Sequence, residues 1–149
     1  MSEKHDGARA YEFLKEIAIL NQLATAELNR ALPDGLHVSH FTIIEHLKQR
    51  GTGQTPQDLA RVFQMSKQNM TNSIAQLQKR GLIKVDPNPN DGRSKIATLT
   101  AAGHAFRERA IEQLSPLLEE ISELSSFQDL DDALPAFQAL RVYLDSRRD

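Results

Sequence analysis

The stretch from Asn90 to Gly103 constrains the fold of this chain more than any other segment. It carries Asp91 two residues before Arg93 in a predicted turn, continues as a short alternating strand, and closes at Thr100, a good N-cap for a following helix. A carboxylate at this spacing can orient the guanidinium and present its donors outward. The stretch therefore predicts a hairpin with a basic tip that leads into a helix. An ordinary surface hairpin with a local ion pair is the alternative.

Three helices are predicted ahead of this hairpin. The first covers residues 39–48 and places its apolar residues on roughly one face. The second begins at Thr55, an N-cap that is followed by proline. The third begins at Ser66 and runs to Arg80, where Gly81 stops it. With the strand that leads into the hairpin, the order is that of a helix-turn-helix followed by a β-wing.

The third helix of this set has an exposed face that is polar and rich in amides. A side-chain amide can bond two groups on an adenine edge, and a hydroxyl can bond a base or a phosphate. A face that is merely solvated more often mixes Glu and Lys. We therefore expect this helix and the hairpin to bind DNA. The residues expected to contact DNA are Ser66, Lys67, Gln68, Asn69, Thr71, Asn72, Gln76, Lys79, Asp91, Arg93 and Lys95.

This ordered set of motifs resembles the MarR family of bacterial and archaeal transcription regulators. The resemblance covers about residues 39–103 and implies a DNA-binding winged helix, with Arg93 in the place of the wing arginine that reaches the minor groove. Gly92 stands where the family usually has a second basic residue. The matching segments are Thr55–Ala60, Met65–Thr71, Leu77–Ile83, Asp91–Arg93 and Leu99–Gly103.

The segments on either side of the winged helix are predicted to be helical, with more apolar surface than a small winged domain needs. We expect residues 8–32 and 101–147 to form dimerisation helices around a DNA-binding lobe at 36–100, all within one domain of residues 1–149. The family resemblance implies the same homodimer, and packing within one subunit is the alternative. The expected fold class is mostly α with a small β-wing.

The distribution of charge agrees with this division. The whole chain has 18 basic and 20 acidic residues, of which residues 39–100 hold 9 basic and 4 acidic, so the net charge is +5 in this segment and −7 elsewhere. The sequence therefore predicts a basic face on an acidic body.

A homodimer places a geometric condition on its DNA. Two recognition helices related by a two-fold axis must meet half-sites about 34 Å apart, so we expect a pseudo-palindromic operator in double-stranded DNA. Phosphate contacts are expected from Lys67, Lys79, Arg80 and Lys95.

The resemblance also implies a mode of regulation. In this family a small ligand, often aromatic or phenolic, commonly binds between the dimerisation helices and the DNA-binding lobe. The chain is accordingly expected to be a repressor that a small-molecule effector relieves. The corresponding junction lies near Leu36, His37, His40 and Phe41.

Several classes of protein are disfavoured by what the sequence lacks. No segment approaches the roughly 18 apolar residues of a membrane span, and the N-terminus has no signal-peptide pattern. The chain has no Cys, which excludes disulfides and thiolate metal sites and fits the cytoplasm. It has no glycine-rich phosphate loop, nucleophile elbow or zinc-protease motif. We expect a cytoplasmic protein that is not an enzyme, has no cofactor and does not enter a membrane.

Two alternatives stay open. A metal site of His37, His40 and His104 with a carboxylate is chemically possible and would make the chain a metal-responsive regulator. We expect no metal, because scattered histidines that cap, pack or face solvent are much commoner. The other alternative is a winged-helix module that binds a partner protein instead of DNA, against which the amide face and the Asp91–Arg93 pair argue.

Overall fold

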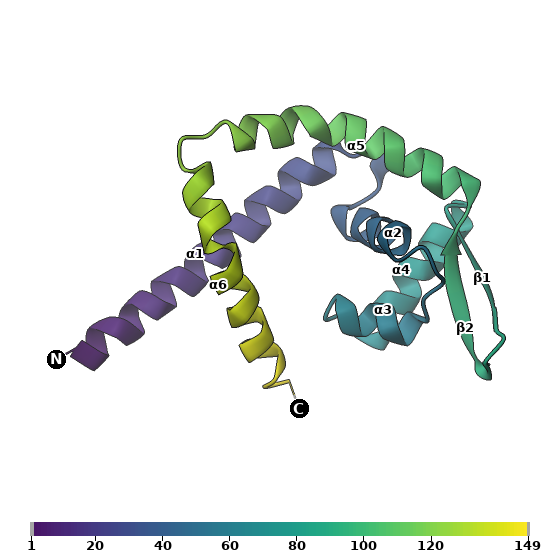
Figure 1. Ribbon diagram of the computed structural model, residues 1–149, viewed down its shortest axis with the longest axis horizontal. Helices are drawn as coiled ribbons and strands as arrows, with labels where there is room; N and C mark the ends of the chain where they lie inside the picture. Colours follow the sequence, from purple (N-terminus) through teal and green to yellow (C-terminus); the bar gives the residue numbers. More distant parts are fainter. Residues whose placement is uncertain (1, 149) are drawn as a thin grey trace.

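Two long helices frame the chain, and the segment between them folds into a small lobe (Figure 1). The computed structural model describes residues 2–148. Helix α1 spans Ser2–Ala31, α5 spans Ala101–Ser122, and α6 spans Phe127–Asp145. The elements of the lobe are η1 (Pro33–Gly35), α2 (Val38–Arg50), α3 (Pro56–Val62), α4 (Lys67–Lys79), β1 (Ile83–Asn88) and β2 (Asp91–Leu99).

The predicted fold class, mostly α with a small β-wing, is confirmed. The helix boundaries differ at a few ends. Helix α1 already begins at Ser2 rather than at residue 8, because the apolar stripe starts later than the helix-forming residues that precede it. Residues 101–147 form two helices, of which α6 begins at Phe127, and its N-cap residue Ser126 makes no side-chain capping bond. No helix within residues 2–148 combines the length and the apolar character that crossing a membrane requires.

The core of the lobe is formed by α2, α3 and α4 together with the buried face of α5. The inward face predicted for α4 is confirmed, since Met70, Ile74 and Leu77 are all buried. Phe106 of α5 is buried to 1% exposure against the same core. Phe41, which was predicted to share the apolar face of its helix, packs at the edge of the core and is only partly buried.

Hydroxyl caps start three helices at the predicted residues. Thr55 and Ser66 each accept a hydrogen bond from the backbone N–H three residues on, at 3.1 Å. Thr100 accepts one from the Gly103 N–H at 3.0 Å and donates its own hydroxyl to the Gly81 carbonyl at 2.5 Å. Gly81 has a φ of +72°, as expected for a glycine that ends α4.

The wing is an antiparallel hairpin in which Ile83 pairs with Leu99. Its turn lies at residues 89–90, so the prediction that placed the turn around Asp91 and Arg93 is wrong: both residues belong to β2. The tip is set by Asn88, whose side-chain oxygen accepts from the N–H two residues on and favours a turn there.

A third short strand segment joins the wing. Gln54 and Ala97 exchange two backbone hydrogen bonds, at 2.9 and 3.1 Å. Gly53 permits this approach, because a Cβ at its position would collide with the Ile96 side chain. The loop before α3 is thereby bonded to β2 near the C-terminal end of the strand.

The first turn of α5 is locked against the end of α4. The Leu82 carbonyl, just beyond α4, accepts a hydrogen bond from the Thr100 N–H at 3.1 Å. Gly103 sits against the same carbonyl, where a Cβ would overlap the backbone oxygen. The helix expected to bind DNA is therefore joined directly to the helix expected to form the dimer.

Candidate nucleic-acid interface

The outer face of α4 carries the side chains that were expected to contact DNA. The buried residues of this helix face inward, which leaves the opposite side open to solvent. The exposed residues of this expected set on α4 and its N-cap are Ser66, Lys67, Gln68, Asn69, Thr71, Asn72, Gln76 and Lys79.

Some of these side chains are held in place by bonds along the helix. The Gln68 side-chain N–H donates to the Asn72 side-chain oxygen at 3.1 Å, across one turn. The Thr71 hydroxyl donates to the Lys67 carbonyl at 2.8 Å. The amide pair therefore presents a fixed pattern of donors and acceptors on an exposed helix face, which suits the recognition of a base edge.

A groove separates α4 from the wing and brings together the basic residues of both. Its volume is about 520 Å³, and its walls are the start of α3, the first turns of α4 and the beginning of β2. Lys67 and Thr71 line one side, and Asp91, Arg93 and Lys95 line the other. The other residues of the expected set on α4 and its N-cap do not line the groove: Ser66, Gln68, Asn69, Asn72, Gln76 and Lys79.

Asp91 does not hold the Arg93 guanidinium, contrary to the prediction. Its carboxylate accepts a hydrogen bond from the Arg93 backbone N–H at 3.0 Å, and no salt bridge joins the two side chains in the described part of the chain. Asp side chains commonly bond the backbone two residues on, since the ring so formed is short and easily closed. Asp91 thus shapes the start of β2, and the Arg93 side chain extends from an exposed position.

Arg80, which was expected to contact a phosphate, lies at the C-terminal end of α4 and contacts η1. Its guanidinium donates to the Asp34 carbonyl at 2.7 Å. Residues 80 and 34 are far apart in sequence, and no local pattern indicates this contact.

The junction expected to bind an effector is partly closed by its own side chains. Leu36 and His40 are buried, whereas His37 is exposed. Asn29 of α1 bonds both the Val38 N–H at 2.7 Å and the His37 ring at 3.2 Å, so α1 supplies the cap of α2.

His40 is a buried polar side chain of this junction. The ring Nδ1 has no hydrogen-bond partner, and the pKa of His40 is lowered, chiefly by burial and further by the charges of His37 and Arg80. His104 lies apart from these residues, in a small cavity beside the end of α2. The structure thus does not assemble the three-histidine site, and no three His, Asp or Glu side chains among the described residues 6–148 are grouped as metal ligands.

An ion pair that the sequence did not indicate ties α2 to α5. Arg107 donates to both carboxylate oxygens of Glu45, at 2.7 and 3.0 Å, and solvent reaches only 18% and 27% of the two side chains. These hydrogen bonds and the guanidinium charge lower the pKa of Glu45, against an opposing effect of burial. Because 62 residues separate the partners, only the folded structure reveals the pair.

Comparisons with known proteins find similarity over parts of this chain. Residues 34–94 match a family model described as MarR family. The curated relative is the transcriptional activatory protein BadR of Rhodopseudomonas palustris, 27% identical over 104 residues, which span 68% of this chain and 59% of BadR.

Solved structures show the same fold. A cysteine-to-serine mutant of MarR from E. coli, crystallised with operator DNA, is 22% identical and superposes with a TM-score of 0.74 over 86% of this chain and 94% of that one. The regulator BldR from Sulfolobus solfataricus is 20% identical, with a TM-score of 0.77 over 88% and 95% of the two chains.

The lowered pKa of His40 predicts how stability depends on pH. The unfolded histidine titrates near pH 6.5 and the folded one at lower pH, so the unfolded chain binds more protons and stability falls as the pH drops from about 7 to 5. We expect His40→Gln to show a smaller drop in melting temperature over this range. His46, whose pKa is also lowered by burial, contributes over the same pH range in both proteins, whereas Glu45 acts below about pH 4.5. Equal drops in the melting temperature of the wild type and of His40→Gln over this pH range would contradict a contribution of His40 to the pH dependence of stability.

Proposed function

We propose that this chain is a dimeric regulator of the MarR family that binds a pseudo-palindromic operator through α4 and the wing. The observation that carries the proposal is the groove in which Lys67 and Thr71 of α4 face Arg93 and Lys95 of β2. A helix with exposed amides beside two basic strand residues fits a helix in the major groove and a wing on the neighbouring backbone.

The parts of the chain take different roles in this proposal. Residues 36–100 form the DNA-binding lobe, and 8–32 and 101–147 form the dimerisation helices of a single domain, 1–149. Amides on α4 read bases, while Lys67, Lys79 and Lys95 bind phosphates. We do not include Arg80 among the residues that bind phosphates, because its guanidinium donates to the Asp34 carbonyl.

The proposed regulator is a repressor that acts by covering its operator and that a small ligand releases. The effector junction of Leu36, His37, His40 and Phe41 supports this, since it joins α1 to the DNA-binding lobe. The name of the R. palustris relative, an activatory protein, makes activation the competing outcome. DNA as the partner places the protein in the cytoplasm, and we assign it no catalytic residue.

A partner-protein module remains the second candidate function. It requires that the groove between α4 and the wing does not bind DNA. The basic side chains that line this groove favour DNA over a protein partner of unknown charge.

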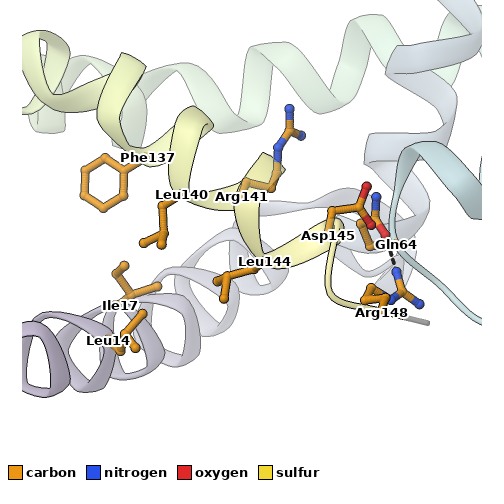
Figure 2. A pocket seen from close by; sticks show the side chains of 9 residues that line it. All are labelled: Leu14, Ile17, Gln64, Phe137, Leu140, Arg141, Leu144, Asp145 and Arg148. Atoms are coloured by element: carbon orange, nitrogen blue, oxygen red, sulfur yellow. Dashed lines mark hydrogen bonds between the residues drawn. The ribbon is translucent and has the colours of Figure 1, made fainter.

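The dimer proposal rests on apolar surface that the chain does not cover itself. No residue of α6 is buried, although the helix is 19 residues long. Its contact with α1 includes stacking of Phe13 on Phe137, with ring centroids 5.4 Å apart. Between the two helices lies a cavity of about 430 Å³, lined by apolar residues of α1 and α6 and edged by Arg141, Asp145 and Arg148 (Figure 2).

A second copy of the chain is the occupant that fits this surface. Large apolar side chains on α1, α5 and α6 remain about half exposed, which is more apolar area than a monomer usually leaves open. Since the same helices carry both surfaces, a two-fold axis can pair them with their own copies. These exposed side chains include Leu20, Leu23, Leu118, Leu130 and Leu134.

Replacing side-chain amides of α4 tests whether this helix recognises the operator sequence. We expect Asn69→Ala or Asn72→Ala to weaken binding to the operator upstream of the chain's own gene by about 1–3 kcal/mol per lost base contact. Non-specific binding should change little. Gln78→Ala is the matched control, because Gln78 is an exposed amide of α4 outside the predicted set. Gel shifts against operator and scrambled DNA measure both quantities.

Arg93→Ala supplies the contrasting variant in the same assay. Loss of one phosphate or minor-groove contact should make the slope of log K for DNA binding against log salt concentration less steep by about one unit. Arg30→Ala, a basic residue of α1, should leave the slope unchanged. DNA binding by the Asn69, Asn72 and Arg93 variants equal to that of the parent would overturn the assignment.

Sedimentation tests the dimer. Leu134→Asp places a charge on an apolar residue of α6 that is 50% exposed, and we expect it to weaken the dimer at least tenfold. Gln138→Asp, an equally charged change at an exposed polar position of α6, should leave the dimer intact. A wild-type chain that sediments as a monomer at micromolar concentration would refute the proposal.

A further inference from the structure

Two exposed amides lie on the side of α4 that is opposite its buried face. Met70, Ile74 and Leu77 define the buried face. At about 3.6 residues per turn, Gln68 and Asn72 lie on the opposite side of the helix, and both are exposed. If α4 enters the major groove, as the proposed function requires, these two side chains are the ones that reach farthest toward the bases.

The charges of α4 stand only at its ends. From residue 67 to residue 79 the helix has one lysine at each end and no other charged residue. Guanine is most commonly recognised by Arg or Lys, whereas adenine is recognised by Gln or Asn. Ala75 follows the two amides on the same side and is exposed, and an alanine methyl can contact the methyl group of thymine. The middle of this face therefore favours an A·T pair over a G·C pair.

One hydrogen bond orients the Gln68 amide and leaves a donor and an acceptor on it. The Gln68 Nε2 donates to the Asn72 Oδ1 at 3.1 Å. An amide nitrogen carries two protons, so the second proton remains available, and so does the carbonyl oxygen. Adenine needs this combination, because its N7 atom accepts and its N6 amino group donates. Guanine presents two acceptors at the same edge, so the Gln68 oxygen would face another oxygen.

We propose that Gln68 reads one adenine in each half-site and that Asn72 positions Gln68 for this contact. The Gln68 Nε2 donates to the adenine N7 atom, and its Oε1 accepts from the N6 amino group. The other Nε2 proton stays bonded to Asn72, which acts through Gln68 and not on a base of its own. Because the amide is oriented before DNA arrives, less side-chain freedom is lost on binding.

Selection of binding sites from randomised double-stranded DNA by the full-length protein tests this division of roles. The wild type should enrich an adenine at one position of each half-site. Gln68→Ala and Asn72→Ala should both lose the preference at that same position and keep the rest of the selected sequence. Asn69→Ala is the matched control, an exposed amide of α4 outside this hydrogen bond, and it should keep the adenine.

A base analogue measures the contact itself. 7-Deazaadenine has a carbon in place of the N7 atom, so it still pairs with thymine but cannot accept a hydrogen bond from Gln68. At the selected position it should weaken binding by the wild type by about three- to tenfold. The affinities of Gln68→Ala and Asn72→Ala should be nearly the same for adenine and for the analogue.

Independent reading by the two amides would give a different result. Gln68→Ala and Asn72→Ala would then relax two different positions, and the proposal would be rejected. It is also rejected if the shared position is a guanine, if neither variant relaxes any position, or if the analogue weakens all three proteins equally. Loss of preference at a single position cannot arise from misfolding. Failure of the regulator proposal is distinguishable, because the wild type would then enrich no sequence at all.

Discussion

The contact between the first turn of α5 and the end of α4 determines how the rest of the molecule can work. Thr100 caps α5 and at the same time bonds the Gly81 carbonyl, while its N–H bonds the Leu82 carbonyl. Gly103 completes the contact, since only a residue without a side chain fits against Leu82. A helix that carries part of the proposed dimer surface is thereby fixed, within a few residues, to the helix proposed to enter DNA.

Other contacts across the same region are weaker but add to this one. The Glu45–Arg107 pair ties α2 to α5 through two hydrogen bonds and is largely shielded from solvent. The contacts of Asp34 with Arg80 and Arg109 are exposed and are easily exchanged. The lobe therefore has a firm attachment at Leu82 and a more easily exchanged one at Asp34.

Local signals in the sequence located most of the fold. The caps at Thr55, Ser66 and Thr100 and the stop at Gly81 were predicted at the right residues, because each depends on a bond within a few positions. The wing was predicted, but its turn was placed too late, since the Asn88 side chain decides the turn earlier.

Contacts between distant segments could not be predicted. Nothing near Gln54 indicates that it pairs with Ala97, and nothing near Glu45 indicates Arg107. The exposed amide face of α4 was predicted because helical periodicity fixes which side is buried. The groove beside Arg93 depends on how α4 and the wing pack, so it emerged only from the folded chain.

The stability of Gly103→Ala measures the central contact most directly. The added methyl has no space against the Leu82 carbonyl, so we expect the free energy of unfolding to fall by about 1–3 kcal/mol. Gly7→Ala in α1 is the matched helical control, because nothing lies within 4 Å of its added Cβ, and it should be neutral or stabilising. Denaturant unfolding of the two variants gives the comparison. A Gly103→Ala protein as stable as the parent would contradict the account of a tight junction between α4 and α5.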